Sequence, residues 1–202
     1  MNQKELYNYL IKIQAITKIG LLYSTDPYAV SNYKEIEALT KAMLEDINKV
    51  KITENNYFKR DIYPTPNISV RTIIWNEKDE FLMVQEKADN GFSFPGGWCD
   101  LYDSPEEAGI REAREEGGVD IQITELVGVF NRTPFKHPVS VPEYVIIYNA
   151  RLIKEVSKPD HEIISVKWVK NGKLPPLSSK VTAQEIVNFI KLAVESKKTA
   201  KR

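Results

Sequence analysis

The segment that most limits how this chain can fold is GGWCDLYDSPEEAGIREAREEGGV, residues 96–119. Ser104, Pro105 and Glu107 occupy the N-cap, N1 and N3 positions of a helix, which is therefore predicted to begin at Pro105. Two consecutive glycines after residue 116 predict its end. The segment thus specifies one short helix with a glycine-containing loop on each side.

Two of the five glutamates in this segment, Glu106 and Glu107, lie in the first turn of the predicted helix, where the helix dipole favours negative charge. Ile110 and Ala113 lie on the side of the helix away from Glu115. These two apolar residues are expected to form a small stripe that packs against the rest of the protein.

The other three glutamates, Glu112, Glu115 and Glu116, fall within an arc of about 100° at the helical rotation of about 100° per residue. Carboxylates this close repel one another, and a divalent cation removes the repulsion. Magnesium, or manganese in its place, suits hard oxygen ligands best. The loop before the helix adds the carbonyl oxygen of Gly97, whose backbone can approach a metal closely because it has no Cβ atom. The sequence therefore predicts a magnesium site.

The first third of the chain is predicted to be helical. Apolar residues recur at helical spacing through residues 4–23 and 26–48, with Ser31 as an expected N-cap in the second helix. Two such helices cannot bury both of their apolar faces alone. They are expected to pack on each other and against a second subunit, which predicts a homodimer.

A change of pattern follows in RDIYPTPNIS, residues 60–69, whose two prolines favour extended backbone. The domain boundary is expected near Asn67, with a helical domain at 1–66 and a second domain at 67–202. The second domain alternates strand-like runs with two helices, a pattern that favours a mixed α/β sandwich over a regular doubly wound sheet. The expected strands are 68–76, 80–86, 121–130, 143–153 and 164–169, and the final helix is 182–197.

Composition excludes several other classes of protein. The 28 Lys and Arg residues balance the 28 Asp and Glu residues, so no overall charge attracts nucleic acid or a membrane. A single cysteine, Cys99, forms no internal disulfide, and two histidines with one cysteine disfavour a structural zinc site. No run reaches membrane-spanning length. A reducing compartment, the cytoplasm, is expected.

The spacing around the acidic helix resembles the Nudix box. That family pattern is glycine, five residues, glutamate, seven residues, then Arg-Glu-apolar-any-Glu-Glu-any-Gly-apolar. Here Gly97 begins the pattern and Arg111–Val119 ends it, and each fixed position matches except Asp103, where the family has glutamate. The similarity extends into residues 92–98 and 165–178. It implies an α+β fold, a Nudix-like α/β/α sandwich with a mixed sheet, over roughly two-thirds of the chain.

What the resemblance implies is Mg²⁺-dependent hydrolysis of the diphosphate in a nucleoside diphosphate joined to another group. By the family pattern, Glu112, Glu115, Glu116 and the carbonyl of Gly97 would ligate metal.

Two further roles follow from the same resemblance. Arg111 would form a salt bridge to Asp103 that holds the loop and the helix together. The general base would be Glu115, or Glu162 from a later loop, and an ordinary solvated turn residue remains the alternative reading of Glu162.

Other residues have less specific signals. Three cations are candidates for contacts with substrate phosphates or else are scattered surface charges: Arg71, Lys87 and Arg132. Phe130 and Phe135 are candidates for stacking on a base or for core packing. Cys99, His137 and His161 are expected to be neither nucleophiles nor ligands.

The substrate is expected to be ADP-ribose, cleaved to AMP and ribose 5-phosphate. Pro134 lies fifteen residues after Val119, about where family members that hydrolyse ADP-ribose carry a proline. The N-terminal region resembles bacterial Nudix pyrophosphatases with a helical extension, including the CDP-choline pyrophosphatase. CDP-choline, cleaved to CMP and phosphocholine, is therefore the rival substrate, and a non-catalytic module that senses a nucleotide sugar is a further alternative.

Overall fold

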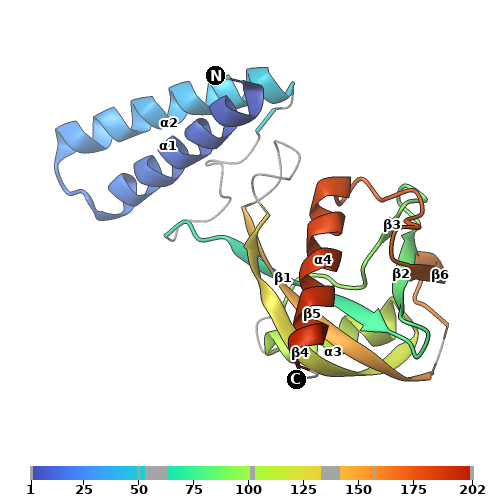
Figure 1. The fold of residues 1–202 in the computed structure, drawn as a ribbon. Helices are drawn as coiled ribbons and strands as arrows, with labels where there is room; N and C mark the ends of the chain where they lie inside the picture. The colour runs from blue at the N-terminus through green and yellow to red at the C-terminus, as the bar shows by residue number, and fades with distance from the viewer. Residues whose placement is uncertain are drawn as a thin grey trace. The chain divides into compact units, whose positions relative to one another are not determined.

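The computed structural model describes residues 2–49, 51–52, 63–100, 103–132, 142–156 and 158–200. The chain divides into an N-terminal helical unit that ends at Pro66 and a larger unit that begins at Asn67. Figure 1 shows the two helices of the first unit and the sheet with its two helices in the second.

The N-terminal unit is a helical hairpin of α1 (Gln3–Tyr23) and α2 (Pro27–Asn48). Helix α1 begins with a capping box in which Asn2 and Glu5 bond each other's backbone N–H groups. Helix α2 begins one turn earlier than expected. Its N-cap is Asp26, whose carboxylate accepts from the N–H of Tyr28 at 3.0 Å, so the prediction of Ser31 as N-cap is wrong. Pro27 at N1 fixes this start.

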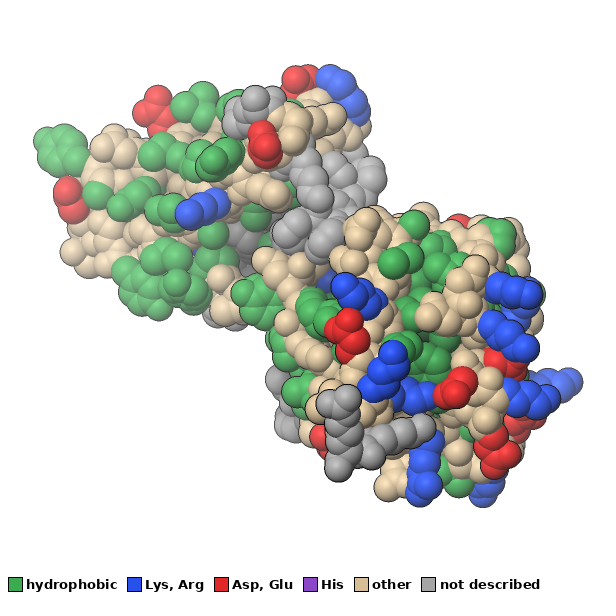
Figure 2. Space-filling view, in the orientation of Figure 1, with side chains coloured by type: hydrophobic (Ala, Val, Ile, Leu, Met, Phe, Trp, Pro, Cys, Tyr) green, Lys and Arg blue, Asp and Glu red, His purple; other side chains and the backbone are tan. Residues whose placement is uncertain are grey.

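One face of each hairpin helix is buried between the two. Tyr7, Leu10 and Ile11 of α1 pack with Leu44 of α2. A second stripe on each helix stays exposed at spacings of three, four or seven residues, which bring side chains to one face of a helix. On α1 it comprises Tyr9, Ile13, Ile16 and Tyr23, and on α2 it comprises Ile36, Leu39 and Met43. Figure 2 shows hydrophobic side chains gathered over this unit. The hairpin therefore leaves apolar surface uncovered, as its sequence predicts.

Among its described residues, the larger unit contains six strands and two helices. They are β1 (Asn67–Trp75), β2 (Glu80–Glu86), β3 (Phe92–Ser93), α3 (Pro105–Glu115), β4 (Val119–Asn131), β5 (Glu143–Glu155), β6 (Ile163–Lys170) and α4 (Ala183–Ala200). The strand order is β3-β2-β1-β5-β4, and β6 pairs with β2. Strands β1 and β5 are parallel whereas the other pairs are antiparallel, so the expected mixed sheet is confirmed.

The two helices cover opposite faces of the sheet (Figure 1). Alternate residues of a strand point to opposite faces. Ile73 of β1 packs in the cluster that contains residues of α4, whereas Ile74 packs in the cluster that contains Ala113 of α3. The expected α/β/α sandwich is therefore confirmed.

A fully buried amide, that of Asn149 on β5, joins α4 to the sheet. Its Oδ1 accepts from Trp75 Nε1 at 2.9 Å, and its Nδ2 donates to Ala193 O at 2.9 Å and to Glu125 Oε2 at 3.0 Å. The same carboxylate oxygen of Glu125 accepts from the hydroxyl of Ser196. These bonds connect β1, β4, β5 and α4.

We predict that Asn149→Ala lowers the free energy of unfolding by about 2–4 kcal/mol, because it leaves several buried polar groups without partners. Urea denaturation followed by circular dichroism measures the change. Gln122→Ala is a matched control, since Gln122 bonds Arg151 across β4 and β5 on the exposed side of the sheet. Equal midpoints for wild type and Asn149→Ala would show that the amide does not fasten α4.

Candidate active site

The glycine loop before α3 takes the place of a missing neighbour strand. Strand β1 pairs with β2 only at Trp75 and Phe81, which leaves the earlier part of that edge open. The segment from residue 95 to residue 99 fills the edge. The bonds are Val70 N–H to Gly97 O at 2.9 Å, Thr72 N–H to Pro95 O at 3.0 Å and Cys99 N–H to Ile68 O at 3.1 Å. The loop is thereby fixed against the sheet.

Close approach to β1 requires glycine at position 96, and Gly97 lies directly against a side chain of α3. Gly96 has φ of 146°, and a Cβ atom there would lie 2.1 Å from Val70 O. A Cβ atom on Gly97 would lie 2.7 Å from Oε1 of Glu112. The loop backbone therefore packs directly against a carboxylate of α3.

Helix α3 begins and ends where the sequence predicts. Ser104 and Glu107 form the capping box, Pro105 is the first helical residue, and the helix ends at Glu115. The prediction for Ile110 is wrong, because its side chain is 42% exposed.

The packing side of α3 consists instead of Ala108, Gly109 and Ala113. A Cβ atom on Gly109 would lie 3.0 Å from Thr72 Oγ1 of the sheet. So close an approach admits only small residues and turns the bulkier Ile110 outward.

Glu116 is the most buried of the three clustered glutamates. It is 9% exposed, and its Oε2 accepts from the N–H of Gly96 at 2.8 Å. Burial raises the pKa of Glu116 to about 7, against the opposing effects of the Gly96 hydrogen bond and the charge of Arg71. Burial also raises the pKa of Glu112, although Arg111 favours its charged form. Ionisation of either carboxylate therefore costs free energy, and a cation bound nearby would remove that cost.

Arg111 fastens the loop to the helix, as the sequence predicts. Its Nε lies 3.1 Å from Asp103 Oδ2, so the shorter side chain of aspartate still reaches the guanidinium. Nη1 of Arg111 also bonds Glu112 at 3.0 Å and Glu115 at 3.1 Å. Although burial disfavours its charge, hydrogen bonding to Asp103 and the charge of Glu112 raise the pKa of Arg111.

These residues fit a hard divalent cation. Glu112 and Glu116 offer desolvated carboxylates that lie against the Gly96–Gly97 backbone. Glu115 is about half exposed and is paired with Arg111. Within the described ranges no three acidic, histidine or cysteine side chains already converge as a ready-made metal cage. Glu115 would have to leave Arg111 to complete the predicted ligand set.

The loop that carries Glu162 lies at the end of α3. The N–H of Asp160 donates to Glu115 O at 2.8 Å, and the N–H of Lys87 donates to Glu162 O at 2.9 Å. The side chain of Glu162 is exposed. The structure thus brings the backbone of both candidates for the general base, Glu115 and Glu162, to one region.

The three candidate cations have different surroundings. Arg71 is half-buried on β1, and its pKa is lowered by burial and by Arg132, while Glu116 and Glu143 oppose that change. Lys87 is exposed beside the Glu162 loop. The reading of Arg132 as a scattered surface charge is wrong, because this side chain is buried.

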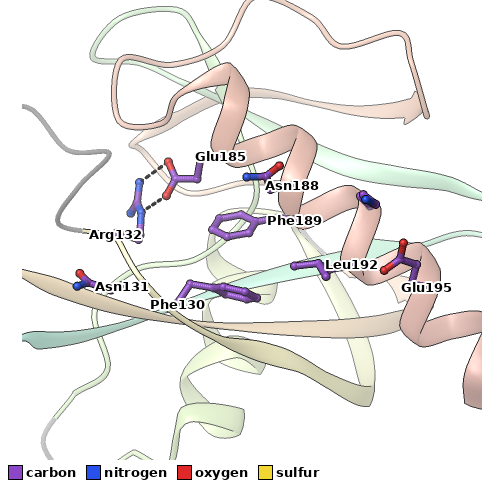
Figure 3. A pocket seen from close by; sticks show the side chains of 9 residues that line it. Phe130, Asn131, Arg132, Glu185, Asn188, Phe189, Leu192 and Glu195 are labelled. Atoms are coloured by element: carbon purple, nitrogen blue, oxygen red, sulfur yellow. Dashed lines mark hydrogen bonds and ion pairs between the residues drawn. The ribbon is translucent and has the colours of Figure 1, made fainter.

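Arg132 forms an ion pair with Glu143 at 3.0 Å. It forms a second ion pair with Glu185, which Figure 3 shows. Beside it, Phe130 packs on Phe189 of α4 with ring centroids 5.3 Å apart. The two rings line a cavity of about 380 Å³ between β4 and α4 (Figure 3). Phe130 thus packs against α4, whereas Pro134, Phe135 and His137 lie outside the described residues.

The expectations for Cys99 and His161 fit their surroundings. Burial raises the pKa of the Cys99 thiol, which disfavours the nucleophilic thiolate. His161 is exposed beside Asp160.

Sequence reasoning missed a buried carboxylate, Glu86, at the end of β2. Its Oε1 accepts from Ser93 Oγ at 2.9 Å and its Oε2 from Lys180 Nζ at 2.5 Å. It lies near enough to Glu116 to disfavour the charge there. No local pattern distinguishes Glu86 from a solvated residue at a strand end, because its ion-pair partner, Lys180, is 94 residues away in the chain.

A loop packed against β1 and an acidic helix fastened to it define a class of protein, the Nudix hydrolases. The model of the NUDIX domain matches residues 65–189, more than half of the chain, and the chain therefore belongs to this family. A second family description, "UDP-X-like, N-terminal oligomerisation domain", matches residues 4–55. Nudix hydrolases generally use divalent metal ions.

The chain is also similar to individual proteins of this family. The chain is 30% identical over 172 residues to "Putative ADP-ribose pyrophosphatase YjhB" of Bacillus subtilis (strain 168), covering 84% of this chain and 82% of that protein. The crystal structure of a UDP-X diphosphatase aligns over 97% of both chains, with a TM-score of 0.60 and 23% identity, and supports the fold alone. An ADP-ribose pyrophosphatase of Streptococcus suis 89-1591 aligns over 66% of this chain and 92% of its own, with a TM-score of 0.56 and 28% identity. No helix in the described part of the chain has the length and hydropathy of a membrane span.

The pKa of Glu116 predicts how the stability of the metal-free protein depends on pH. The folded state binds this proton more tightly than the unfolded state, whose pKa is near 4.5. The free energy of unfolding therefore falls as pH rises from about 4.5 to about 7, by about 3 kcal/mol from this group. We expect Glu116→Gln to lack this loss, so that the variant matches wild type near pH 4.5 and is more stable above pH 7.

Urea denaturation of both proteins in EDTA across this range measures the difference. Since other titrating groups are common to both proteins, they cancel in the comparison. A difference that does not change with pH would mean that Glu116 is not desolvated in the folded state.

Proposed function

We propose that this chain is a Mg²⁺-dependent pyrophosphatase that cleaves ADP-ribose to AMP and ribose 5-phosphate. The observation that carries the chemistry is the placement of the desolvated Glu112 and Glu116 carboxylates against the Gly96–Gly97 backbone. The choice of ADP-ribose is supported by two relatives whose names state this activity, one from Bacillus subtilis and one from Streptococcus suis.

In this proposal Glu112, Glu115, Glu116 and the carbonyl of Gly97 hold the metal. Bound Mg²⁺ would supply charge neutralisation at the diphosphate and a more acidic water. Glu115, or Glu162 from the loop bonded to its backbone, takes the proton of the attacking water.

Asp103 and Arg111 keep the loop on the helix while this occurs. Arg71, half-buried beside the carboxylates, is placed to contact a phosphate oxygen, whereas Lys87 is a candidate only from its exposed position near Glu162. Arg132 would influence the contact with a phosphate only indirectly, because its guanidinium group already forms ion pairs with Glu143 and Glu185.

A second candidate substrate is another nucleoside diphosphate conjugate, with CDP-choline first among them. The N-terminal match to a UDP-X-like domain over residues 4–55 favours it, because that description does not specify ribose phosphate as the second group. The reaction would use the same residues and give CMP and phosphocholine.

We predict that, in the presence of Mg²⁺, wild type hydrolyses ADP-ribose faster than CDP-choline or UDP-glucose. Glu116→Gln should lower kcat by about 100-fold or more, because a metal ligand is lost. Glu106→Gln is the control, since Glu106 lies in the first turn of the same helix, away from the clustered face. Chromatographic separation of the products gives both rates and the bond that is cleaved. Faster release of CMP than of AMP would reassign the substrate, and equal rates for wild type and Glu116→Gln would exclude the proposed site.

We further propose that the helical hairpin forms a homodimer. Its exposed stripes on α1 and α2 are apolar, and the domain it matches is described as an oligomerisation domain. These stripes would bury against their counterparts in a second copy.

The paired substitution Ile16→Lys with Leu39→Lys is predicted to convert the dimer to monomer, because it places charge in the apolar contact. Light scattering after size-exclusion chromatography measures the mass, and circular dichroism checks that the helices persist. Lys34→Glu, exposed on a different side of α2, should leave the dimer intact. A monomeric wild type, or a variant that stays dimeric, would contradict the assignment of this surface.

A further inference from the structure

Glu86 lies near Glu116 of the glutamate cluster and forms an ion pair with a cation from a distant part of the chain. Glu86 is 4% exposed, and its partner Lys180 comes from the segment just before α4. The other oxygen of Glu86 holds Ser93, two residues before the loop segment that lies along β1. Glu86 thus connects Lys180 to the strand that leads into the glycine loop.

The backbone that carries Lys180 is fastened on both sides. Asp89 Oδ2 accepts from the N–H of Ser179 at 2.6 Å and from the hydroxyls of Ser178 and Ser179 at 3.0 and 2.7 Å. The carbonyl of Lys180 accepts from Arg132 Nη2 at 2.7 Å. A lysine held in this way loses little conformational entropy when it binds a ligand.

The backbone of Gly91 adds a steric constraint. A Cβ atom on Gly91 would lie 2.3 Å from Ser178 Cα, so the β2–β3 turn and residue 178 are in direct contact. The segment therefore has little freedom to move away from β2.

The ion pair with Glu86 does not use all the hydrogen-bond donors of the Lys180 ammonium group. An ammonium group has three donors, and Glu86 takes one of them. The side chain is 45% exposed, so the remaining N–H groups are open to a ligand from solvent. The pair Lys170 with Glu80, at the opposite end of β2, shows the contrast: its atoms are 3.9 Å apart and Lys170 is more exposed.

We propose that Lys180 is a phosphate-binding residue of this active site, which donates to a non-bridging oxygen of the substrate diphosphate while Glu86 holds and orients its ammonium. Arg71 and Lys180 then provide cations from β1 and from the segment before α4. The proposal rests on the proposed function only in requiring that the substrate carry a diphosphate.

The test compares Lys180→Gln, Lys180→Arg and the control Lys170→Gln with wild type. With whichever conjugate wild type hydrolyses, Lys180→Gln should raise KM by about 10- to 100-fold with kcat within about threefold, because a charge-assisted hydrogen bond to substrate is lost. Lys180→Arg should recover part of the loss, and Lys170→Gln should match wild type. Thermal melting of each variant, without ligand, separates an effect on folding from one on binding.

A second measurement does not depend on turnover. Calorimetric titration with ADP and with inorganic pyrophosphate, both with Mg²⁺, should show Kd for Lys180→Gln weakened by a similar factor. If wild type hydrolyses none of the three conjugates, the proposed function fails while this titration still tests the lysine. Equal Kd values for wild type and Lys180→Gln, or a loss of melting temperature with no change in Kd or KM, would overturn the phosphate-binding role. So would the absence of ADP and pyrophosphate binding to wild type.

Discussion

The hydrogen bonds between the glycine loop and the open edge of β1 are the constraint on which the site depends. β2 leaves β1 after one residue pair, and the N–H groups of Val70 and Thr72 would otherwise be buried without partners. The loop satisfies them with the carbonyls of Gly97 and Pro95. Because those carbonyls bond the sheet, the intervening N–H of Gly96 is free to bond Glu116, and one backbone segment joins the sheet to the acidic helix.

The packing of the loop between the sheet and α3 stabilises the fold. At the same place it makes the charged forms of two carboxylates less favourable. Packing α3 through alanine and glycine brings its carboxylates close to the backbone, and that closeness removes water from Glu112 and Glu116. Arg111 compensates part of the charge while also holding Asp103. In the proposed function, the remaining uncompensated charge would give the site its affinity for a divalent cation, so that some stability of the metal-free protein would be exchanged for binding.

Local signals in the sequence predicted the features of this structure that depend on neighbouring residues. They did not predict the features that depend on contacts between distant parts of the chain. The start and end of α3 depend on residues within one turn, so they could be predicted from one segment. The ion pair of Asp103 with Arg111 was implied by the resemblance to the family pattern. The exposure of Ile110 depends on how closely α3 approaches Thr72, which only the packed structure specifies. Glu86 and Lys180 are 94 residues apart, and nothing near either residue indicates the other. The start of α2 was predicted wrongly, although Asp26 followed by Pro27 is itself a local signal for a helix start. Ser31, a second residue of a type that caps helices, was chosen in its place.

The residues at the start of α4 help to position the site and also form part of the buried interior. Glu185 completes a capping box with Thr182 and also pairs with Arg132, which in turn bonds Glu143 and the carbonyl of Lys180. Glu143 also accepts from Ser69, two residues before Arg71. Because the side chains of Arg132, Glu143 and Glu185 are buried, removing one would leave a charge without its partner, which costs far more than a surface ion pair contributes. The network therefore fixes the segment before α4 relative to β1. Cations from these two distant parts of the sequence are thereby held in a constant position with respect to the acidic helix.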